Sequence, residues 1–517
     1  MDTNDSCFDV QVTSTAIVCP TKSPSSKSIT VPLSIVDCTV SYYARCACVL
    51  YYHPPPPSEP VLSATHLQNS LAQTLDYYPQ WCGQLSYTKA QKPGAGHTAR
   101  YHRVNLTYST SNDVGVVFTT ATSPKVLADI IPSAEQRIKS DRAWDAGHVN
   151  ASELIPSIPL AMSRQAKPDS PNMIIQHTVF ACGSTTIGIA MTHGLADAQS
   201  MSHFVHDWSV MSHSMLSSGD DLPKPTPVFD PGLLDRYAAG DIDADYPDPS
   251  IKAKSQKLPR LRGDWYKHVE GQPWPTMTPP DWHEQDLSTL SESDPIPWSD
   301  WDTTAPVSNR ILHFSSADIL QIYASAQSAA DGARFSKLDA LLAHLWQCIA
   351  RAREVPQKHI CLTFGLRARL SPPLPSNFLG SPIMNALVPV PCTASQIRQS
   401  LSDFTNDNLA AILHAEAFEV SPQRLWRAML GGANLLVTTW LNLKLYELNW
   451  GTGVGTVRWV QPEMGSDGLV EIMEAPSLGE KGGIHWSDNG VDINLFLESK
   501  AMARVLADRE LFPGVES

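Results

Sequence analysis

The chain has 517 residues, of which 42% are hydrophobic and 17% are charged, as expected of a globular protein with substantial cores. Its formal net charge of -14 disfavours binding to nucleic acid through a basic surface. No apolar run of about 18 residues predicts a membrane span, and the polar, acidic N-terminus does not have the pattern of a secretory signal. The cysteines show no Cys-x-x-Cys spacing, which favours a reducing, cytoplasmic compartment.

Apolar runs in the first half predict several strands, the clearest being 44–52, 83–87, 114–120 and 173–181. Residues 67–75 place their apolar side chains on one helical face, and Pro79 ends that helix. The run 173–181 pairs naturally with 185–191 across Cys182-Gly-Ser184, so a hairpin is expected just before His193. Asp197 then suits the N-cap of a helix that continues to about residue 215.

Residues 216–309 differ in composition, because they are rich in Pro, Asp, Ser and Trp and show little periodicity. We interpret them as a long crossover between two lobes, ordered by its Trp and Tyr side chains. A disordered linker is the alternative, and the aromatic residues argue against it.

The second half resumes a mixed pattern. Strands are expected at 310–314, 360–364, 435–440, 457–460, 469–472 and 491–496, and helices at 338–354, 395–415, 422–431 and 499–509. Ser336 has the position of an N-cap for the first of these helices. The chain is therefore predicted to be α/β, with an N-terminal lobe (1–215), the crossover (216–309) and a C-terminal lobe (310–517).

His193 is the first candidate for chemistry, since it follows a buried strand and is held by structure on both sides. A general base needs a fixed position and a pKa near neutral. The spacing His-x-x-x-Asp is weak evidence, because about one such match is expected by chance. His203 and Asp207 repeat the spacing inside the following helix, where a solvated or capping pair is the simpler interpretation. For His193 alone, a histidine satisfied within the core is an equally good alternative.

Other motifs fail on context. The segment Gly451-Thr-Gly453-Val-Gly455 lacks the spacing and the βαβ setting of a dinucleotide site. His203 and His206 have no further ligand pattern around them, so no metal site is expected. No Gly-x-Ser-x-Gly motif is present for a serine hydrolase.

Five landmarks occur in an order that resembles the BAHD acyltransferases, closest to fungal secondary-metabolite members such as the trichothecene O-acetyltransferases. They are residues 67–85, the motif 193–197, the helix 335–353, the segment 366–380 and the paired elements 438–440 and 449–453. The resemblance covers nearly the whole chain. It implies a two-lobed fold like that of chloramphenicol acetyltransferase, with mixed sheets and a central channel between the lobes.

The resemblance also implies site roles. His193 would be the general base, and Asp197 would point away from the substrate and pair with Arg367. Ser336 and Lys337 are expected to contact coenzyme A phosphates, because a helix N-terminus with a cation beside it binds anions. The remaining roles are structural support from Asn449, Gly451 and Gly453 and lining of the acceptor site by Thr438 and Trp440. The family's Asp is Asn449 here and its Trp is Thr452, so an ion pair at that element becomes a hydrogen bond at most.

The implied reaction is transfer of an acyl group, in the first place acetyl, from acyl-CoA to a hydroxyl of an apolar natural product. We expect a monomer that needs no metal and has a small-molecule alcohol as its partner. Two alternatives stay open from the sequence. The fold can serve a cyclisation or isomerisation that uses no coenzyme A, or the chain can be a non-catalytic member of the family.

Overall fold

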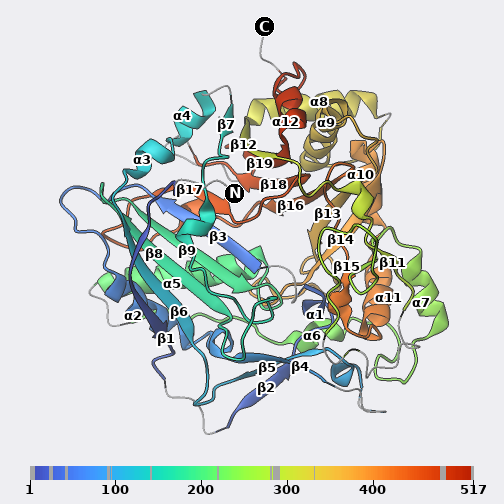
Figure 1. Ribbon diagram of the computed structural model, residues 1–517, viewed down its shortest axis with the longest axis horizontal. Coiled ribbons are helices and arrows are strands. Elements are labelled where there is room, and N and C mark those ends of the chain that lie inside the picture. Colours follow the sequence, from blue (N-terminus) through green and yellow to red (C-terminus); the bar gives the residue numbers. More distant parts are fainter. Residues whose placement is uncertain are drawn as a thin grey trace.

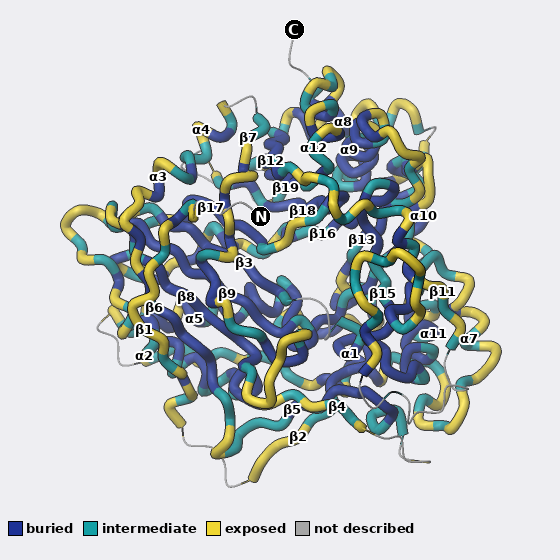
Figure 2. The backbone as a smooth tube through the Cα atoms, in the orientation of Figure 1, coloured by how far each residue is buried: buried dark blue, intermediate teal, exposed yellow. Residues whose placement is uncertain are grey.

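The computed structural model describes residues 6–22, 27–40, 45–89, 94, 96–139, 142–217, 221–279, 282, 291–330, 332–477 and 485–513. Two large mixed sheets organise these residues, and helices cover them (Figure 1). Figure 2 shows that the strands β8 and β9 are mostly buried, whereas connecting segments at the periphery are exposed, and helix α5 buries one side. The fold is therefore mixed α/β, as predicted.

The first sheet has the strand order β1-β6-β8-β9-β3-β17. Its strands are β1 (Gln11–Val18), β6 (Val116–Ser123), β8 (Met173–Phe180), β9 (Thr185–Thr192), β3 (Arg45–Tyr52) and β17 (Val457–Pro462). All residues of β9 are buried, and the predicted hairpin with β8 is confirmed by their antiparallel pairing. Helices α2 (Ala64–Leu75) and α5 (Ala198–Leu216) pack together, and both contribute to the core that covers one face of this sheet.

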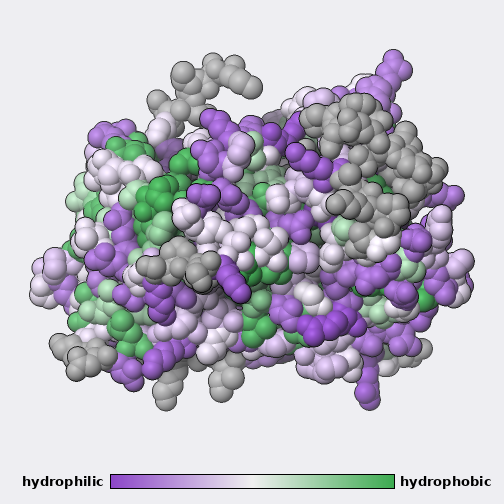
Figure 3. Space-filling view, turned by 90° about the horizontal axis from the view of Figure 1, so that it is seen from below, coloured by the Kyte–Doolittle hydropathy of each residue, from purple (hydrophilic) through white to green (hydrophobic). Residues whose placement is uncertain are grey.

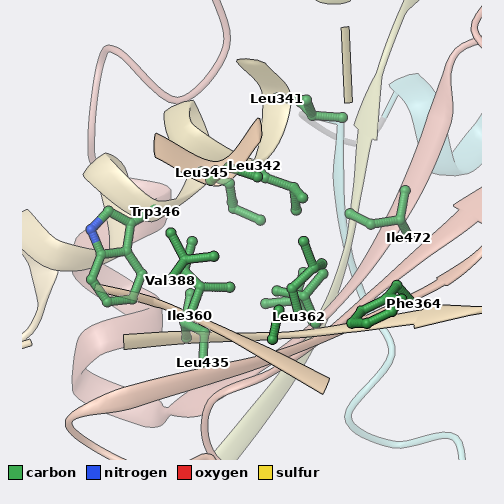
Figure 4. Packing of buried hydrophobic residues seen from close by; sticks show 14 of the residues in the cluster. Leu341, Leu342, Leu345, Trp346, Ile360, Leu362, Phe364, Val388, Leu435 and Ile472 are labelled. Carbon is green, nitrogen blue, oxygen red and sulfur yellow. The ribbon is translucent and has the colours of Figure 1, made fainter. Parts of the chain in front are cut away.

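The second sheet has the order β14-β13-β16-β18-β19-β12-β7. Its strands are β14 (Ile383–Pro389), β13 (His359–Gly365), β16 (Asn434–Trp440), β18 (Leu469–Glu474), β19 (Val491–Glu498), β12 (Val307–Phe314) and β7 (Ala143–Asp145). Helix α9 (Lys337–Ala352) lies on this sheet with Leu341, Leu345 and Trp346 facing the strands (Figure 4). Ser336 caps the helix as predicted, in a reciprocal capping box with Asp339.

Each sheet takes a strand from the other half of the chain. β17 belongs to the second half and pairs with β3, while β7 belongs to the first half and pairs with β12. These two exchanges tie the halves together by backbone hydrogen bonds. Local sequence does not reveal such pairings, because they join residues far apart along the chain.

The described part of the crossover is ordered by an aromatic cluster. It contains α6 (Pro231–Asp235), α7 (Pro249–Gln256), β10 (Gly263–Asp264) and β11 (Asp294–Pro295). Trp265 stacks on Trp426, with ring centroids 5.0 Å apart and planes 9° apart, and Trp274, Trp298 and Trp301 pack around them. The buried Arg424 is paired with Asp264 and Glu419 and so fastens this segment to the C-terminal half.

Of two helical regions predicted in the second half, the first is confirmed but divided, and the second was wrong. The helix expected at 395–415 is two helices, α10 (Ala394–Ser402) and α11 (Asn406–Ala417), because Thr405 caps a new helix. The helix expected at 422–431 is a short turn followed by β15 (Leu425–Trp426). β15 pairs with β10 of the crossover, and this long-range pairing overrides the local helical pattern.

The other elements complete the envelope. They are β2 (Ile29–Pro32), β4 (Gln84–Tyr87) and β5 (Val104–Tyr108) in a small sheet, and helices α1 (Asp37–Val40), α3 (Leu127–Ile130), α4 (Ala134–Lys139), α8 (Ser316–Ala329) and α12 (Ser499–Leu506). On the face in Figure 3, hydrophobic side chains form separated patches among hydrophilic ones. Within the described ranges, no helix has the length and apolar character needed to cross a membrane.

Candidate active site

His193 lies directly after β9, at the end of a central strand of the first sheet. Its side chain is half-buried, and Nδ1 lies 2.9 Å from Oγ of Ser381, which comes from the C-terminal half. That contact occupies Nδ1 and leaves Nε2 as the ring nitrogen available for proton transfer. The imidazole is therefore held by a rigid strand on one side and by the opposite half of the molecule on the other.

His193 lines two cavities at once. One has a volume of about 500 Å³ and is lined mostly by apolar and aromatic side chains, including four tryptophans. The other has a volume of about 230 Å³ and contains more polar lining residues, such as Gln199 and Arg367. The residues shared by both linings are His193, Thr363, Ile383, Thr438 and Met464. A base at such a junction can reach a molecule in either cavity.

Burial lowers the pKa of the His193 imidazole, although a hydrogen bond to its own backbone carbonyl and the Asp197 charge act in the opposite direction. The ring is consequently neutral near pH 7 and able to accept a proton. This state is the one required of a general base.

Asp197 and Arg367 form a buried, two-point ion pair. Nη1 of Arg367 donates to one carboxylate oxygen of Asp197 at 2.6 Å, and Nη2 donates to the other at 3.0 Å. Asp197 also caps α5 by accepting from the backbone of Ser200 at 2.8 Å. Burial alone would raise the pKa of Asp197, but the Arg367 charge and these hydrogen bonds outweigh it and lower that pKa. The pair fixes the turn between His193 and α5.

Ser381 was not identified from the sequence, although it has the most direct contact with His193. Its backbone N–H donates to Asp37 at 2.6 Å, and Asp37 in turn accepts from the Ser34 hydroxyl at 2.6 Å. Burial raises the pKa of Asp37 to about 7, although the hydrogen bonds from Ser34 and Ser381 act against this. Only the tertiary structure brings residues 37, 193 and 381 together, so no local pattern could have indicated this contact.

The segment Asn449–Gly453 lines neither cavity. Asn449 closes its own turn by accepting from the backbone of Gly451 at 3.0 Å, in the place of an ion pair. The fully buried Trp450 donates to Tyr52 at 2.7 Å. Gly453 has a φ of 84°, and an added Cβ would lie 2.6 Å from the Pro60 carbonyl, so only glycine fits there. This geometry is that of a packing element between the two halves.

Ser336 and Lys337 also lie outside both linings. The Ser336 hydroxyl is engaged by Arg398 at 3.0 Å and by the capping box, and Lys337 donates to Ser487 at 3.3 Å. Arg369 lies close to Arg398, and burial followed by the Arg398 charge lowers its pKa. Arg398 is itself paired with Asp339 at 2.6 Å in the first turn of α9, and the expected contact of Ser336 and Lys337 with coenzyme A remains a prediction.

Thr438 and Trp440 are placed differently from each other. Thr438 lines both cavities, whereas Trp440 lines only the smaller one.

In the second His-x-x-x-Asp motif, His203 contacts the Ser376 carbonyl at 2.6 Å, and Asp207 bonds to Tyr78 rather than to His203. Among the described residues, no group of three potential metal ligands occurs.

Comparisons with known proteins agree with this geometry. A family model described as "Transferase family" matches residues 8–235 and 275–512. Acyltransferase AFT15-1 of Alternaria alternata is 27% identical over 488 residues, which span 89% of this chain and 89% of the relative. Acyltransferase abl6 of Leptosphaeria maculans is 24% identical over 531 residues, covering 97% of this chain and 98% of the relative.

Solved structures share the fold at low sequence identity. TRI101 of F. graminearum, complexed with ethyl coenzyme A, has a TM-score of 0.62 at 14% identity and covers 94% of this chain and 98% of its own. Vinorine synthase has a TM-score of 0.57 at 17% identity and covers 96% of each chain. Because the family model matches most of the sequence, the chain belongs to the Transferase family and is an acyltransferase of the BAHD type.

Proposed function

We propose that the protein transfers an acyl group, in the first place acetyl, from acyl-CoA to a hydroxyl of a largely apolar natural product. The observation that carries this proposal is the position of His193 on both cavities. Transfer between two substrates requires one base to be within reach of both, and a junction between two cavities meets that requirement. TRI101 supports the proposal, since its structures are named for complexes with coenzyme A and with the toxins T-2 and deoxynivalenol.

The larger cavity would hold the acceptor and the smaller one the thioester end of the donor. The aromatic lining of the larger cavity suits an apolar ring compound. The smaller cavity includes Phe364, against which Arg369 lies 4.8 Å from the ring centroid. Arg369 thus provides positive charge towards this end, which favours a phosphate-bearing donor and supports the predicted role of Ser336 and Lys337. In this arrangement Trp440 would face the donor instead of the acceptor.

In the proposed reaction, Nε2 of His193 removes the proton from the acceptor hydroxyl while its oxygen attacks the thioester carbonyl. The tetrahedral intermediate carries one negative charge on the former carbonyl oxygen. The Thr438 hydroxyl lines both cavities and is the candidate donor for that oxygen. Collapse of the intermediate breaks the C–S bond, and the imidazolium returns its proton to the departing thiolate. Asp197 takes no part in these proton transfers, because Arg367 occupies both of its oxygens.

We further propose that the enzyme acts as a monomer in a reducing, cytoplasmic compartment, in secondary metabolism. All of its cysteines are free in the structure, which supports a reducing environment. The hydrophobic patches on the face in Figure 3 are separated from one another, which supports a monomer because a subunit interface usually needs a larger continuous patch.

The decisive test replaces His193 by Ala and follows the release of free thiol from acetyl-CoA in the presence of hydroxylated ring compounds. We expect turnover to fall by about two to four orders of magnitude with an unchanged melting temperature. His203→Ala is the matched control, because His203 has the same sequence spacing to an Asp but lines neither cavity. Normal turnover by the His193 variant would exclude this mechanism. Conversion of an acceptor without thiol release would instead favour cyclisation or isomerisation.

A further inference from the structure

Arg260 brings a buried cation to the wall of the larger cavity. Its side chain is only 9% exposed, and it lines the cavity from the crossover segment just before β10. Nη2 donates to Glu416 at 2.6 Å. Among the described residues the guanidinium has no other hydrogen-bond acceptor, although it carries five N–H donors. Donors on Nε and Nη1 are therefore available to a molecule in the cavity.

Arg427 lines the same cavity but has no nitrogen left to donate to a ligand. It donates to Glu416 from Nε at 3.2 Å, and its Nη1 donates to the carbonyls of Pro422 and Leu425 at 3.2 and 2.8 Å. Its Nη2 also bonds to Glu416. Every nitrogen of Arg427 thus has a protein partner, so of these two arginines Arg260 is the one with open donors. Arg164 also lines the cavity, but it is exposed to solvent.

The ion-paired network behind this wall carries an excess of positive charge. Counted over the residues that the structure describes, its cations outnumber its carboxylates by one, the members being Arg260, Arg262, Arg424 and Arg427 against Asp264, Glu416 and Glu419. A buried charge without a counter-ion is unfavourable. A ligand that brings one negative charge to Arg260 would complete the network.

Arg260 belongs to the end of the cavity remote from His193. Strand β14 runs along the cavity, with Ile383 and Asn385 on the lining, and Ile383 also lines the smaller cavity beside His193. Further along the strand, Leu387 donates its backbone N–H to Pro259 at 2.9 Å. Four residues of strand span roughly 13 Å. The indole rings of Trp265 and Trp426, both lining residues, stack on each other within this wall.

From these observations we propose that the acceptor is a multi-ring hydroxy acid, with its hydroxyl at His193 and its carboxylate on Arg260. Its rings would lie against the tryptophan wall that the crossover supplies. A short hydroxy acid would not span the two ends, and a neutral alcohol would bring no negative charge to the open donors of Arg260. This proposal rests on the proposed acyl transfer, since it assigns the acceptor of that reaction.

The test compares two ligands of the same shape by isothermal titration calorimetry, with the whole protein saturated with coenzyme A, which carries no acyl group to transfer. One is a hydroxynaphthoate, and the other carries a methyl group in place of the carboxylate. We expect the hydroxynaphthoate to bind about tenfold more tightly or better, as a charge-assisted hydrogen bond to the carboxylate predicts. Arg260→Gln should abolish this preference and leave the affinity of the methyl compound nearly unchanged.

Arg262→Gln is the matched control, because Arg262 belongs to the same network but does not line the cavity, and it should retain the preference. Equal binding of the two ligands to the wild type, or binding of neither, would overturn the proposal. The proposal would also be overturned if Arg260→Gln weakened the binding of both ligands equally. If that variant does not fold, the wild-type comparison alone decides. A separate assay of free-thiol release from acetyl-CoA distinguishes the two proposals. If the protein prefers the carboxylate ligand but releases no thiol, acyl transfer alone is refuted. If it releases thiol but binds the two ligands with equal affinity, the assignment of a hydroxy acid as acceptor alone is refuted.

Discussion

Replacing Arg367 by Gln tests whether the buried ion pair fixes the turn that carries His193. Arg367 donates to both oxygens of Asp197, to the Ser200 hydroxyl at 2.8 Å and to the Phe378 carbonyl at 3.0 Å. Its loss would leave a buried carboxylate without a cation and a carbonyl without its donor. Removing one partner of a buried pair destabilises a protein by about 3 to 5 kcal/mol, and we expect a loss of that size in the free energy of unfolding.

The pH dependence provides an internal check of this reasoning. In the wild type the pKa of Asp197 is lowered in the folded state, because Arg367 outweighs the effect of burial. Its contribution to stability is present above the pKa of an unfolded Asp, about 4, and is lost as the pH falls through the lower folded value. The difference in stability between wild type and Arg367→Gln should therefore be full near neutral pH and shrink below about pH 4.

Urea denaturation, followed by intrinsic fluorescence, would measure the loss, and free-thiol release would measure turnover in parallel. Arg369→Gln is a suitable control for the stability measurement, because Arg369 is also partly buried but does not contact Asp197. It should lose about 1 kcal/mol, the usual value of one hydrogen bond. An Arg367 variant with wild-type stability and turnover would refute the view that this pair holds His193 in place.

Three further changes test other parts of the structure. Ser381→Ala removes the partner of His193 Nδ1, so kcat should fall about tenfold with KM and the melting temperature little changed; an unaltered kcat would contradict this. Gly188→Ala should strongly destabilise the fold, since its Cβ would lie 1.9 Å from the Leu154 carbonyl, and a normal melting temperature would count against the close packing of β9. Burial raises the pKa of Glu471 to about 8, so the wild type should lose stability as the pH rises from about 4.5 to 8. The free energy of unfolding of Glu471→Gln should rise relative to that of the wild type by a few kcal/mol (about 5 at most) over that range. If the difference in urea midpoint between the two proteins were the same at about pH 5 and pH 9, the raised pKa of Glu471 would be refuted.

Features set by neighbouring residues were predicted from the sequence. The hairpin of β8 and β9, the N-cap Asp197 and the N-cap Ser336 depend on residues within a few positions of each other. The order of the BAHD landmarks then indicated that Asp197 and Arg367 would be close, which residue spacing alone does not. The structure contains that pair, whereas the catalytic role of His193 remains a proposal.

The tryptophan wall of the larger cavity could not be predicted, because it is built from distant segments. Arg260 meets Glu416 across 156 positions of sequence, and Trp265 stacks on Trp426 through the pairing of β10 with β15. The composition of 216–309 indicated that its tryptophans were ordered but not what they faced. The same long-range pairing explains why the helix expected at 422–431 is absent. β15 gains backbone hydrogen bonds from β10, and local helix propensity takes no account of such bonds.

The position of His193 depends on contact between the two halves of the chain. Asp197 donates its backbone N–H to the Gly380 carbonyl at 3.0 Å, and Ser200 both donates to that carbonyl at 2.7 Å and accepts from the Gly380 N–H at 3.1 Å. Gly380 has a φ of 133°, and an added Cβ would lie 3.0 Å from the Asp37 carboxylate, so this close approach requires glycine. Separation of the halves would break these bonds together with the contact of His193 to Ser381. The proposed mechanism therefore requires both substrates to reach His193 through the two cavities while the halves stay joined, because an opened molecule would no longer hold this histidine in place.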